Sequence, residues 1–177
     1  MHQLFFYDGY RLKYQGPMPH SKKEVLYQLA VGLEHIHSMK FIHCDIKPHN
    51  ALIWVGYDGA RGIEKVLMKW ADFGISRRVG EAWTASLGTQ SWKAPELLES
   101  QKNKNPKQSW SAKCDVFAEG LVFAYFLLNG KHPYDDSNKR NFSKIDSNIS
   151  NEKYIVNLQG KIFNAFKRIL LVLVINY

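Results

Sequence analysis

The segment from Asp115 to Asn129 is apolar on every side of a helix, and it constrains the fold more than any other part of the chain. A helix without a polar face is stable only when other elements surround it. The following Gly130 supplies a C-terminal stop together with Asn129. The segment therefore predicts a central helix in a domain that 177 residues can form. Its apolar members are Val116, Phe117, Leu121, Val122, Phe123, Tyr125, Phe126, Leu127 and Leu128.

A second helix is predicted over residues 22–38. Ser21 and Glu24 have the spacing of a capping box, in which the serine hydroxyl accepts a hydrogen bond from the backbone amide three residues later. Apolar residues then recur in steps of three and four, which marks one buried face. A shorter helix is expected from Pro95, because proline is favoured in the first turn. The apolar positions of the 22–38 helix are Leu26, Leu29, Leu33 and Ile36.

A β-hairpin is predicted between these helices. Residues 51–55 and 64–71 are strand-like, and the intervening glycines favour a turn. Antiparallel pairing about residue 60 brings position 50 opposite position 70. Asn50 and Asp72 should therefore finish at the same end of the hairpin, which brings two oxygen ligands together. The whole pattern predicts a mainly helical α+β fold.

The remaining segments carry weaker signals. We expect residues 1–20 to be irregular, with room for a short helix, and residues 75–93 to form a long loop. Residues 135–152 are rich in Ser, Asn, Lys and Asp, which is typical of a linker or a weak helix. A final helix is expected over residues 158–170.

Composition limits the partners. The net charge is +8, but the lysines are scattered, so we prefer surface solvation over nucleic-acid binding. The two cysteines, Cys44 and Cys114, form no C-x-x-C pair, which favours a reducing compartment. The apolar run 169–175 is far shorter than the roughly 20 residues that a membrane helix needs. We therefore expect no membrane span in this chain.

The chemistry is concentrated at residues 43–50, which read HCDIKPHN. This stretch resembles the protein-kinase catalytic loop, H-R-D-x-x-x-x-N. The resemblance implies that Asp45 is the catalytic base, that Lys47 stabilises charge on the transferred phosphoryl group and contacts ATP, and that Asn50 binds Mg²⁺ and ATP phosphates. His43 is then the structural histidine of the loop.

Three further kinase-like motifs follow in the family's order. Residues 72–74 read DFG, residues 88–96 read GTQSWKAPE, and residues 115–120 begin the apolar helix with an aspartate. The resemblance implies a Ser/Thr protein kinase C-terminal lobe that uses ATP and Mg²⁺ to phosphorylate a protein hydroxyl. It makes Asp72 a metal and cofactor ligand and Thr89 part of the substrate platform. The structural residues that it implies are Phe73, Gly74, Glu96 and Asp115.

The chain is also similar to the inositol-requiring kinase/endoribonuclease sensors of the unfolded-protein response. The similarity is carried by residues 42–53, 71–78 and 130–134. It implies a hinge or linker over residues 1–20, a kinase core over 21–134 and divergent, incomplete C-terminal helices over 135–177. It also implies a second kinase as dimer partner, and a cytoplasmic location, at the cytosolic face of the endoplasmic reticulum for a longer sensor.

Several departures from the kinase pattern lower the expected activity. Cys44 replaces an arginine that pairs with activation-loop phosphate in the family, and a small buried thiol cannot do so. No G-x-G-x-x-G occurs, and Lys13 is the only lysine before Lys22, so we expect the N-terminal lobe to be missing. Only Arg140 and Arg168 remain to pair with Glu96. The chain is therefore expected to be a weakly active or inactive fragment. The alternatives are a non-catalytic, pseudokinase-like interaction module and part of a kinase/endoribonuclease stress sensor.

Overall fold

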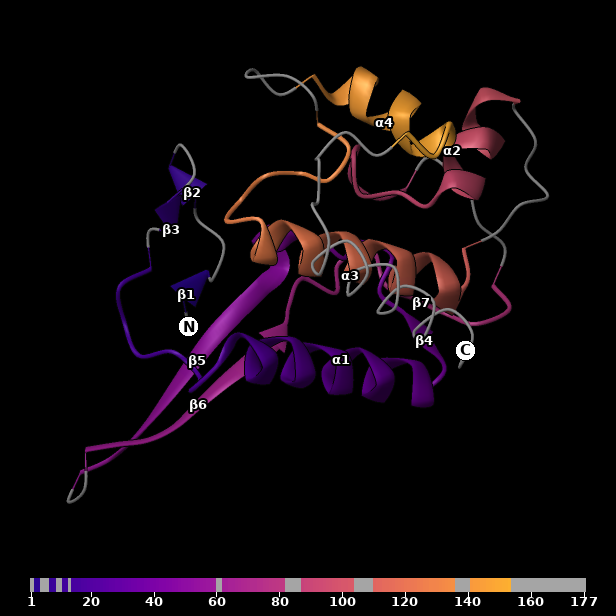
Figure 1. The fold of residues 1–177 in the computed structure, drawn as a ribbon. Helices are drawn as coiled ribbons and strands as arrows, with labels where there is room; N and C mark the ends of the chain where they lie inside the picture. Colours follow the sequence, from indigo (N-terminus) through magenta and orange to yellow (C-terminus); the bar gives the residue numbers. More distant parts are fainter. Residues whose placement is uncertain are drawn as a thin grey trace.

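The computed structural model describes residues 14–59, 62–81, 87–103, 110–135 and 141–153, together with three two-residue strands that precede them. Within these residues, four α-helices and small antiparallel sheets form the domain (Figure 1). The helices are α1 (Lys22–Ser38), α2 (Pro95–Lys102), α3 (Ala112–Leu127) and α4 (Phe142–Ser150). The strands are β1 (His2–Gln3), β2 (Tyr7–Asp8), β3 (Arg11–Leu12), β4 (Phe41–Ile42), β5 (Ala51–Asp58), β6 (Gly62–Trp70) and β7 (Arg77–Arg78).

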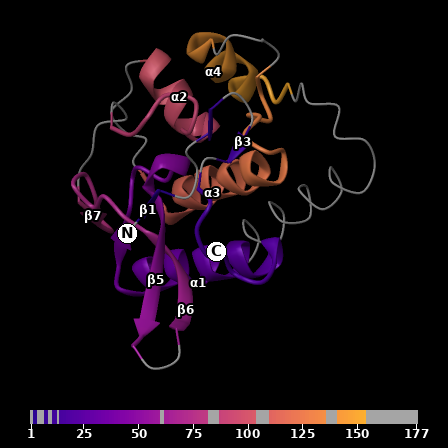
Figure 2. The same cartoon turned by 90° about the vertical axis from the view of Figure 1, so that its left-hand side faces the viewer.

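Helix α3 is the centre of the molecule, as its apolar sequence predicts. It lies between α1 on one side and the α2–α4 pair on the other, and Figure 2 shows the same order from a second direction. The apolar face of α1 packs against α3 and the hairpin, while Leu121 joins α2 and α4 in a separate cluster. The helix begins at Ala112, three residues before the predicted start, and ends at Leu127 before Asn129 and Gly130, both of positive φ.

Helix α1 has the predicted bounds, and its capping explains where it begins. The Glu24 N–H donates to Ser21 Oγ at 3.1 Å, which satisfies one of the open amides of the first turn. The Glu24 carboxylate instead accepts a hydrogen bond from Gln28 Nε2 at 2.8 Å. Of the stripe that the pattern placed inside, Leu29, Leu33 and Ile36 are buried, and Leu26 is partly buried against the same core.

The predicted hairpin is present, with one change in register. Near the turn, Tyr57 pairs with Ile63, as expected for a hairpin centred on residue 60. An irregularity beside Gly56 then shifts the pairing, because Glu64 is an extra residue on β6. Ala51 consequently lies opposite Trp70, one residue from the predicted register. The shift preserves the prediction that matters for the site, since the hairpin still ends with Asn50 beside Ala71.

Two loop predictions need correction. Residues 1–20 contain short strands, and β1 pairs with β5 to give the sheet order β1-β5-β6. The long loop predicted over 75–93 contains β7, which pairs antiparallel with β4. Both segments are ordered by backbone pairing with strands that are distant in the sequence. The local sequence pattern does not predict such pairing.

The segment predicted as a linker or weak helix over 135–152 contains α4. Ile145 and Ile149 are one helical turn apart and fully buried, so α4 is anchored in the core despite its polar composition. The final helix expected over 158–170 lies outside the described residues. No helix in the described part of the chain has the length and hydropathy needed to cross a membrane.

Candidate active site

A buried carboxylate on α3 holds the 43–50 loop in place. Asp115 is fully buried and accepts hydrogen bonds from the His43 N–H at 2.7 Å, the Cys44 N–H at 3.0 Å and His37 Nε2 at 3.0 Å. Hydrogen bonds to a charged acceptor are the strong ones, and they are stronger still away from water. Cys44 has φ 66°, a left-handed conformation that these contacts maintain.

Asp45 lies at the centre of a closed polar network. Its Oδ1 accepts from Thr89 Oγ1 at 2.6 Å, and its Oδ2 accepts from Lys47 Nζ at 2.6 Å. Lys47 Nζ also donates to Thr89 Oγ1 at 2.9 Å, so the three side chains form a triangle. Asn50 Nδ2 completes the network by donating to the Asp45 carbonyl at 2.8 Å and to Asp45 Oδ2 at 3.2 Å. This arrangement can orient a hydroxyl and accept its proton beside a fixed positive charge.

Asn50 and Asp72 meet at the end of the hairpin, as the sequence predicts. The Ala71 N–H donates to the Asn50 carbonyl at 2.9 Å, which places the next residue, Asp72, beside Asn50. Asp72 is exposed and has φ 66°. A side chain at Gly74 would lie 3.3 Å from Asp72 Oδ1, so glycine leaves that carboxylate accessible.

These two residues suit a magnesium ion that takes its other ligands from phosphate and water. The donor set is one carboxylate and one amide oxygen, because Asn50 Nδ2 is turned toward Asp45. Magnesium prefers oxygen ligands and retains waters, whereas a zinc site needs several nitrogen or sulfur ligands. Within the described ranges, no group of three or more His, Cys, Asp or Glu residues is arranged to hold a metal.

His43 joins the loop to the strand that precedes Asp72. Its Nε2 donates to the Ala71 carbonyl at 3.0 Å, and its Nδ1 accepts from the Asp45 N–H at 3.3 Å. Burial lowers the pKa of His43, although the nearby Asp115 carboxylate opposes the shift, and the two contacts together require a neutral ring. The ring also packs against Phe73, with centroids 4.9 Å apart.

The segment that carries Thr89 is fastened to α4 and to the loop after α3, and its partner on α4, Asp146, is a residue that the sequence did not single out. Ser91 has φ 68°; its N–H donates to Asp146 Oδ1 at 2.8 Å and its carbonyl accepts from His132 Nε2 at 2.9 Å. Burial lowers the pKa of Lys93 and raises that of Asp146, and each moderates the shift of the other. Asp146 lies in a polar run without a motif, so no local signal identifies it.

Glu96 has a different partner from the arginine of the family pattern. Cys114 Sγ donates to Glu96 Oε1 at 3.4 Å. Burial, followed by the Glu96 charge, raises the pKa of the Cys114 thiol to about 12. Arg140 and Arg168 lie outside the described residues. Cys44 is fully buried, and burial raises its pKa, which agrees with a protonated side chain without a redox role.

A second buried acid on α3 was also missed. Glu119 is 2% exposed, and its Oε1 has no hydrogen-bond partner in the described part of the chain. Burial raises the pKa of Glu119 to about 8, while a hydrogen bond from Trp70 acts in the opposite direction. The sequence signal that could have identified Glu119 is its position, because it is an acid inside an apolar helix.

Comparison with known proteins agrees with the geometry. The protein kinase domain family matches residues 10–173, so the chain belongs to the protein kinase family. Within that family it is similar to kinase/endoribonucleases of the IRE1 type.

Three relatives define the similarity. The chain is 32% identical over 142 residues to serine/threonine-protein kinase/endoribonuclease IRE1 of Hypocrea jecorina (63% of this chain, 11% of the relative). It is 40% identical over 119 residues to IRE2 of Homo sapiens (64% and 12%) and 32% identical over 143 residues to ire-1 of Caenorhabditis elegans (76% and 13%). The chain thus matches 11–13% of the length of these relatives. The predicted protein kinase family and the predicted similarity to kinase/endoribonucleases are confirmed, whereas the missing N-terminal lobe stays a prediction.

Proposed function

We propose that this chain carries the catalytic lobe of a Ser/Thr protein kinase, which transfers the ATP γ-phosphoryl group to a protein hydroxyl. The observation that carries the proposal is the triangle of Asp45, Lys47 and Thr89, with edges of 2.6, 2.6 and 2.9 Å. A carboxylate, an ammonium and a hydroxyl held this closely are already ordered for reaction, so little reorganisation is required.

Each residue has a separate role in this proposal. Asp45 orients the acceptor hydroxyl and accepts its proton as the oxygen bonds to phosphorus. Lys47, whose ammonium lies 2.6 Å from Asp45, stabilises negative charge on the transferred group. Thr89 fixes both side chains and forms part of the acceptor platform. Hydroxyl groups of Ser and Thr are the expected acceptors because the relatives carry that specificity in their names.

Asn50 and Asp72 are the proposed ligands of magnesium and, through it, of the ATP phosphates. Bound Mg²⁺ would neutralise charge on the β- and γ-phosphates. The Asn50 amide is held by Asp45, whereas Asp72 is open to solvent. Phe73 and Gly74 support Asp72, the first by packing on His43 and the second by leaving space beside its carboxylate.

The wider assignment rests on the relatives. A protein substrate, a kinase dimer partner and a location at the cytosolic face of the endoplasmic reticulum are proposed by analogy with the kinase/endoribonucleases. No nucleic-acid partner is proposed for this chain. Its activity is proposed to be low when it acts alone, since the sequence lacks a glycine-rich phosphate loop.

The proposal is tested by phosphoryl transfer from labelled ATP with Mg²⁺ to mixed Ser, Thr and Tyr peptides. We expect slow transfer to Ser and Thr that Asp45→Asn and Asp72→Asn each abolish. Circular dichroism and thermal denaturation verify that both variants are folded. Lys113→Ala is the control, because Lys113 is exposed on α3 and outside the network.

A second measurement separates catalysis from nucleotide binding. Saturating ATP and Mg²⁺ should raise the Tm of the wild-type chain, and Asp72→Asn should remove the shift. Transfer that persists in Asp45→Asn would contradict the assigned base. If the wild-type chain shows no transfer and no Tm shift, the result would favour the non-catalytic interaction module.

A further inference from the structure

A pocket of about 490 Å³ opens away from the candidate active site, between the segment before α1, the first turns of α1 and strand β6. Its volume is within the range of small-ligand and peptide side-chain sites. None of the residues that form the Asp45 network or the Asn50–Asp72 end of the hairpin lines it. The lining consists of Pro17, Met18, Pro19, Val66 and Leu67, with His20, Glu24, Gln28 and Lys65.

The pocket borders the outer edge of a β-sheet. Strand β6 is the last strand in the order β1-β5-β6, and the hairpin that it forms with β5 extends beyond the helices (Figure 1). An edge strand presents unpaired N–H and C=O groups to any chain that approaches in an extended conformation. The polypeptide backbone of β6 is therefore a binding surface in its own right.

One side chain already imitates a neighbouring strand on this edge. Gln28 Oε1 accepts from the Met68 N–H at 2.7 Å, and Gln28 Nε2 donates to the Val66 carbonyl at 3.5 Å. These contacts identify Val66 and Met68 as residues whose backbone groups point outward. By the alternation of an antiparallel ladder, the Val66 N–H points the same way, and Gln28 supplies no acceptor for it. The edge is covered by Gln28 at one end and continues beside the pocket.

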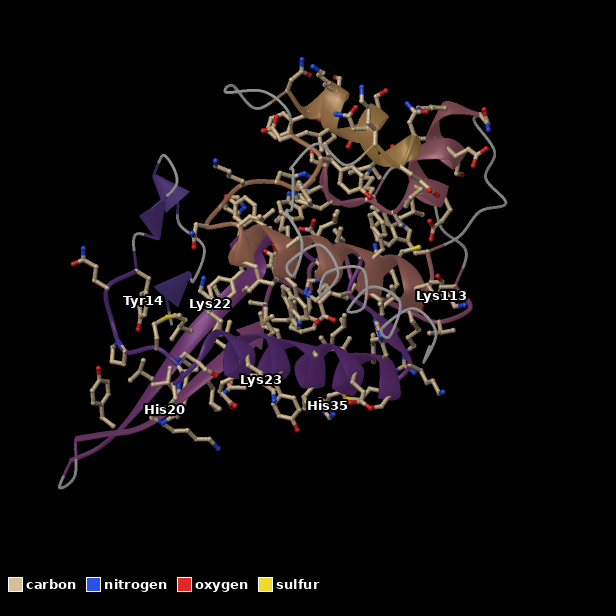
Figure 3. All side chains as sticks on the ribbon, in the orientation of Figure 1. Tyr14, His20, Lys22, Lys23, His35 and Lys113 are labelled. Atoms are coloured by element: carbon tan, nitrogen blue, oxygen red, sulfur yellow. The ribbon has the colours of Figure 1, made fainter. Side chains whose placement is uncertain are left out.

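The charges around the pocket favour an acidic partner. His20 and Lys65 line it, and Lys23 follows in the first turn of α1, beside the positive end of the helix dipole. Figure 3 shows His20 and Lys23 at the same end of this helix. The single acid in the lining, Glu24, is partly buried and accepts a hydrogen bond from Gln28.

We propose that this groove binds an extended peptide segment of another protein in which an aliphatic residue and an Asp or Glu stand two positions apart, so that both side chains lie on the face of the sheet that carries Lys65 and Leu67. The peptide backbone pairs with the β6 edge beyond Gln28, as in strand addition. An aliphatic side chain enters between Met18 and Leu67, and an acidic side chain faces Lys65. The groove thus recruits a partner without using the residues assigned to phosphoryl transfer.

The partner chemistry is tested by selecting short random peptides on the immobilised full chain and measuring the enriched peptides by fluorescence anisotropy. We expect enrichment of sequences in which an aliphatic residue and an acidic residue stand two positions apart. Lys65→Glu should weaken their binding by at least about tenfold, because a like charge then faces the acidic side chain. Lys69→Glu is the matched control, since Lys69 is exposed on the same strand but does not line the pocket.

A second variant tests the groove independently of charge. Leu67→Asn should weaken binding by a similar factor without adding a charge, and hydrogen exchange should show protection of the Val66 amide when peptide is bound to the wild type. Enriched peptides that are basic, or that bind Lys65→Glu and Lys69→Glu equally, would overturn the proposal. Binding that requires removal of residues 169–175 would identify the chain's own segment as the occupant and would also overturn it.

Discussion

The two sides of the candidate active site differ in how they are held. On the proposed acceptor side, Asp45 is 9% exposed and bonded to Lys47 and Thr89 within 2.9 Å. On the proposed nucleotide side, Asp72 and Gly74 are exposed and Phe73 is 52% exposed. The acceptor side is therefore ordered by its own side chains. The nucleotide side is ordered mainly by the backbone of the hairpin that leads to it.

The largest loss of stability is expected at Asp115, which supports both sides of the site. Asp115→Ala should lower the free energy of unfolding by about 3–5 kcal/mol, because three buried donors lose their charged acceptor. Urea denaturation measures the loss, with the exposed Lys113→Ala as control on the same helix. A loss below about 1 kcal/mol would show that the two sides have independent supports.

The next effect depends on pH and concerns Glu119 on α3. The pKa of Glu119 is about 8 in the folded protein, above the usual glutamate value of 4.5, so the folded state retains a proton that the unfolded state releases. This contribution to stability is fully present below pH 4.5 and falls as the pH rises to 8. Glu119→Gln should remove that dependence and leave the variant more stable at pH 8 by a few kcal/mol. Thermal denaturation from pH 5 to 8 measures it, and parallel curves for variant and wild type would contradict the prediction.

A smaller loss of stability is expected at Thr89, on the acceptor side. Thr89→Ala should cost about 1–2 kcal/mol, since Asp45 Oδ1 loses its hydroxyl donor. Thr89→Ser should recover most of that loss because it retains the hydroxyl. Chemical denaturation of the pair provides the measurement. Equal stability of the two variants would show that packing of the threonine methyl group, rather than the hydrogen bond, stabilises this side.

The smallest effect is expected at Phe73. Phe73→Ala should lower the free energy of unfolding by about 1 kcal/mol or less, because the ring is half exposed and contacts His43 as a tilted aromatic pair. Denaturation of this variant beside Thr89→Ala compares the two sides directly. A loss above about 2 kcal/mol would show that side chains stabilise the nucleotide side at least as much as the acceptor side.

Much of the fold is predictable from local sequence, and the exceptions share a cause. The bounds of α1 follow from the Ser21 cap and the apolar stripe, and the meeting of Asn50 with Ala71 follows from the hairpin. The register is displaced because the extra residue, Glu64, has no sequence signal of its own. Helix α4 is stabilised by tertiary burial of two isoleucines that a polar composition obscures.

The candidate site shows the same division. The motifs place Asp45, Lys47 and Asp72 in the chain because each motif is contiguous. The contacts of Asp146 and His132 with Ser91 join positions 55 and 41 residues apart, so only the folded chain reveals them. Glu119 was missed because its effect depends on what surrounds the helix.

The Asp115 contacts also determine how the 43–50 loop should respond to thermal opening. The amides of His43 and Cys44 belong to no helix or hairpin, yet their hydrogen bonds end on a carboxylate inside α3. Deuterium can reach these amides only when that helix separates from the loop. Their exchange should therefore require nearly the whole free energy of global unfolding, so these two amides should exchange as slowly as those of the core although they belong to no regular element.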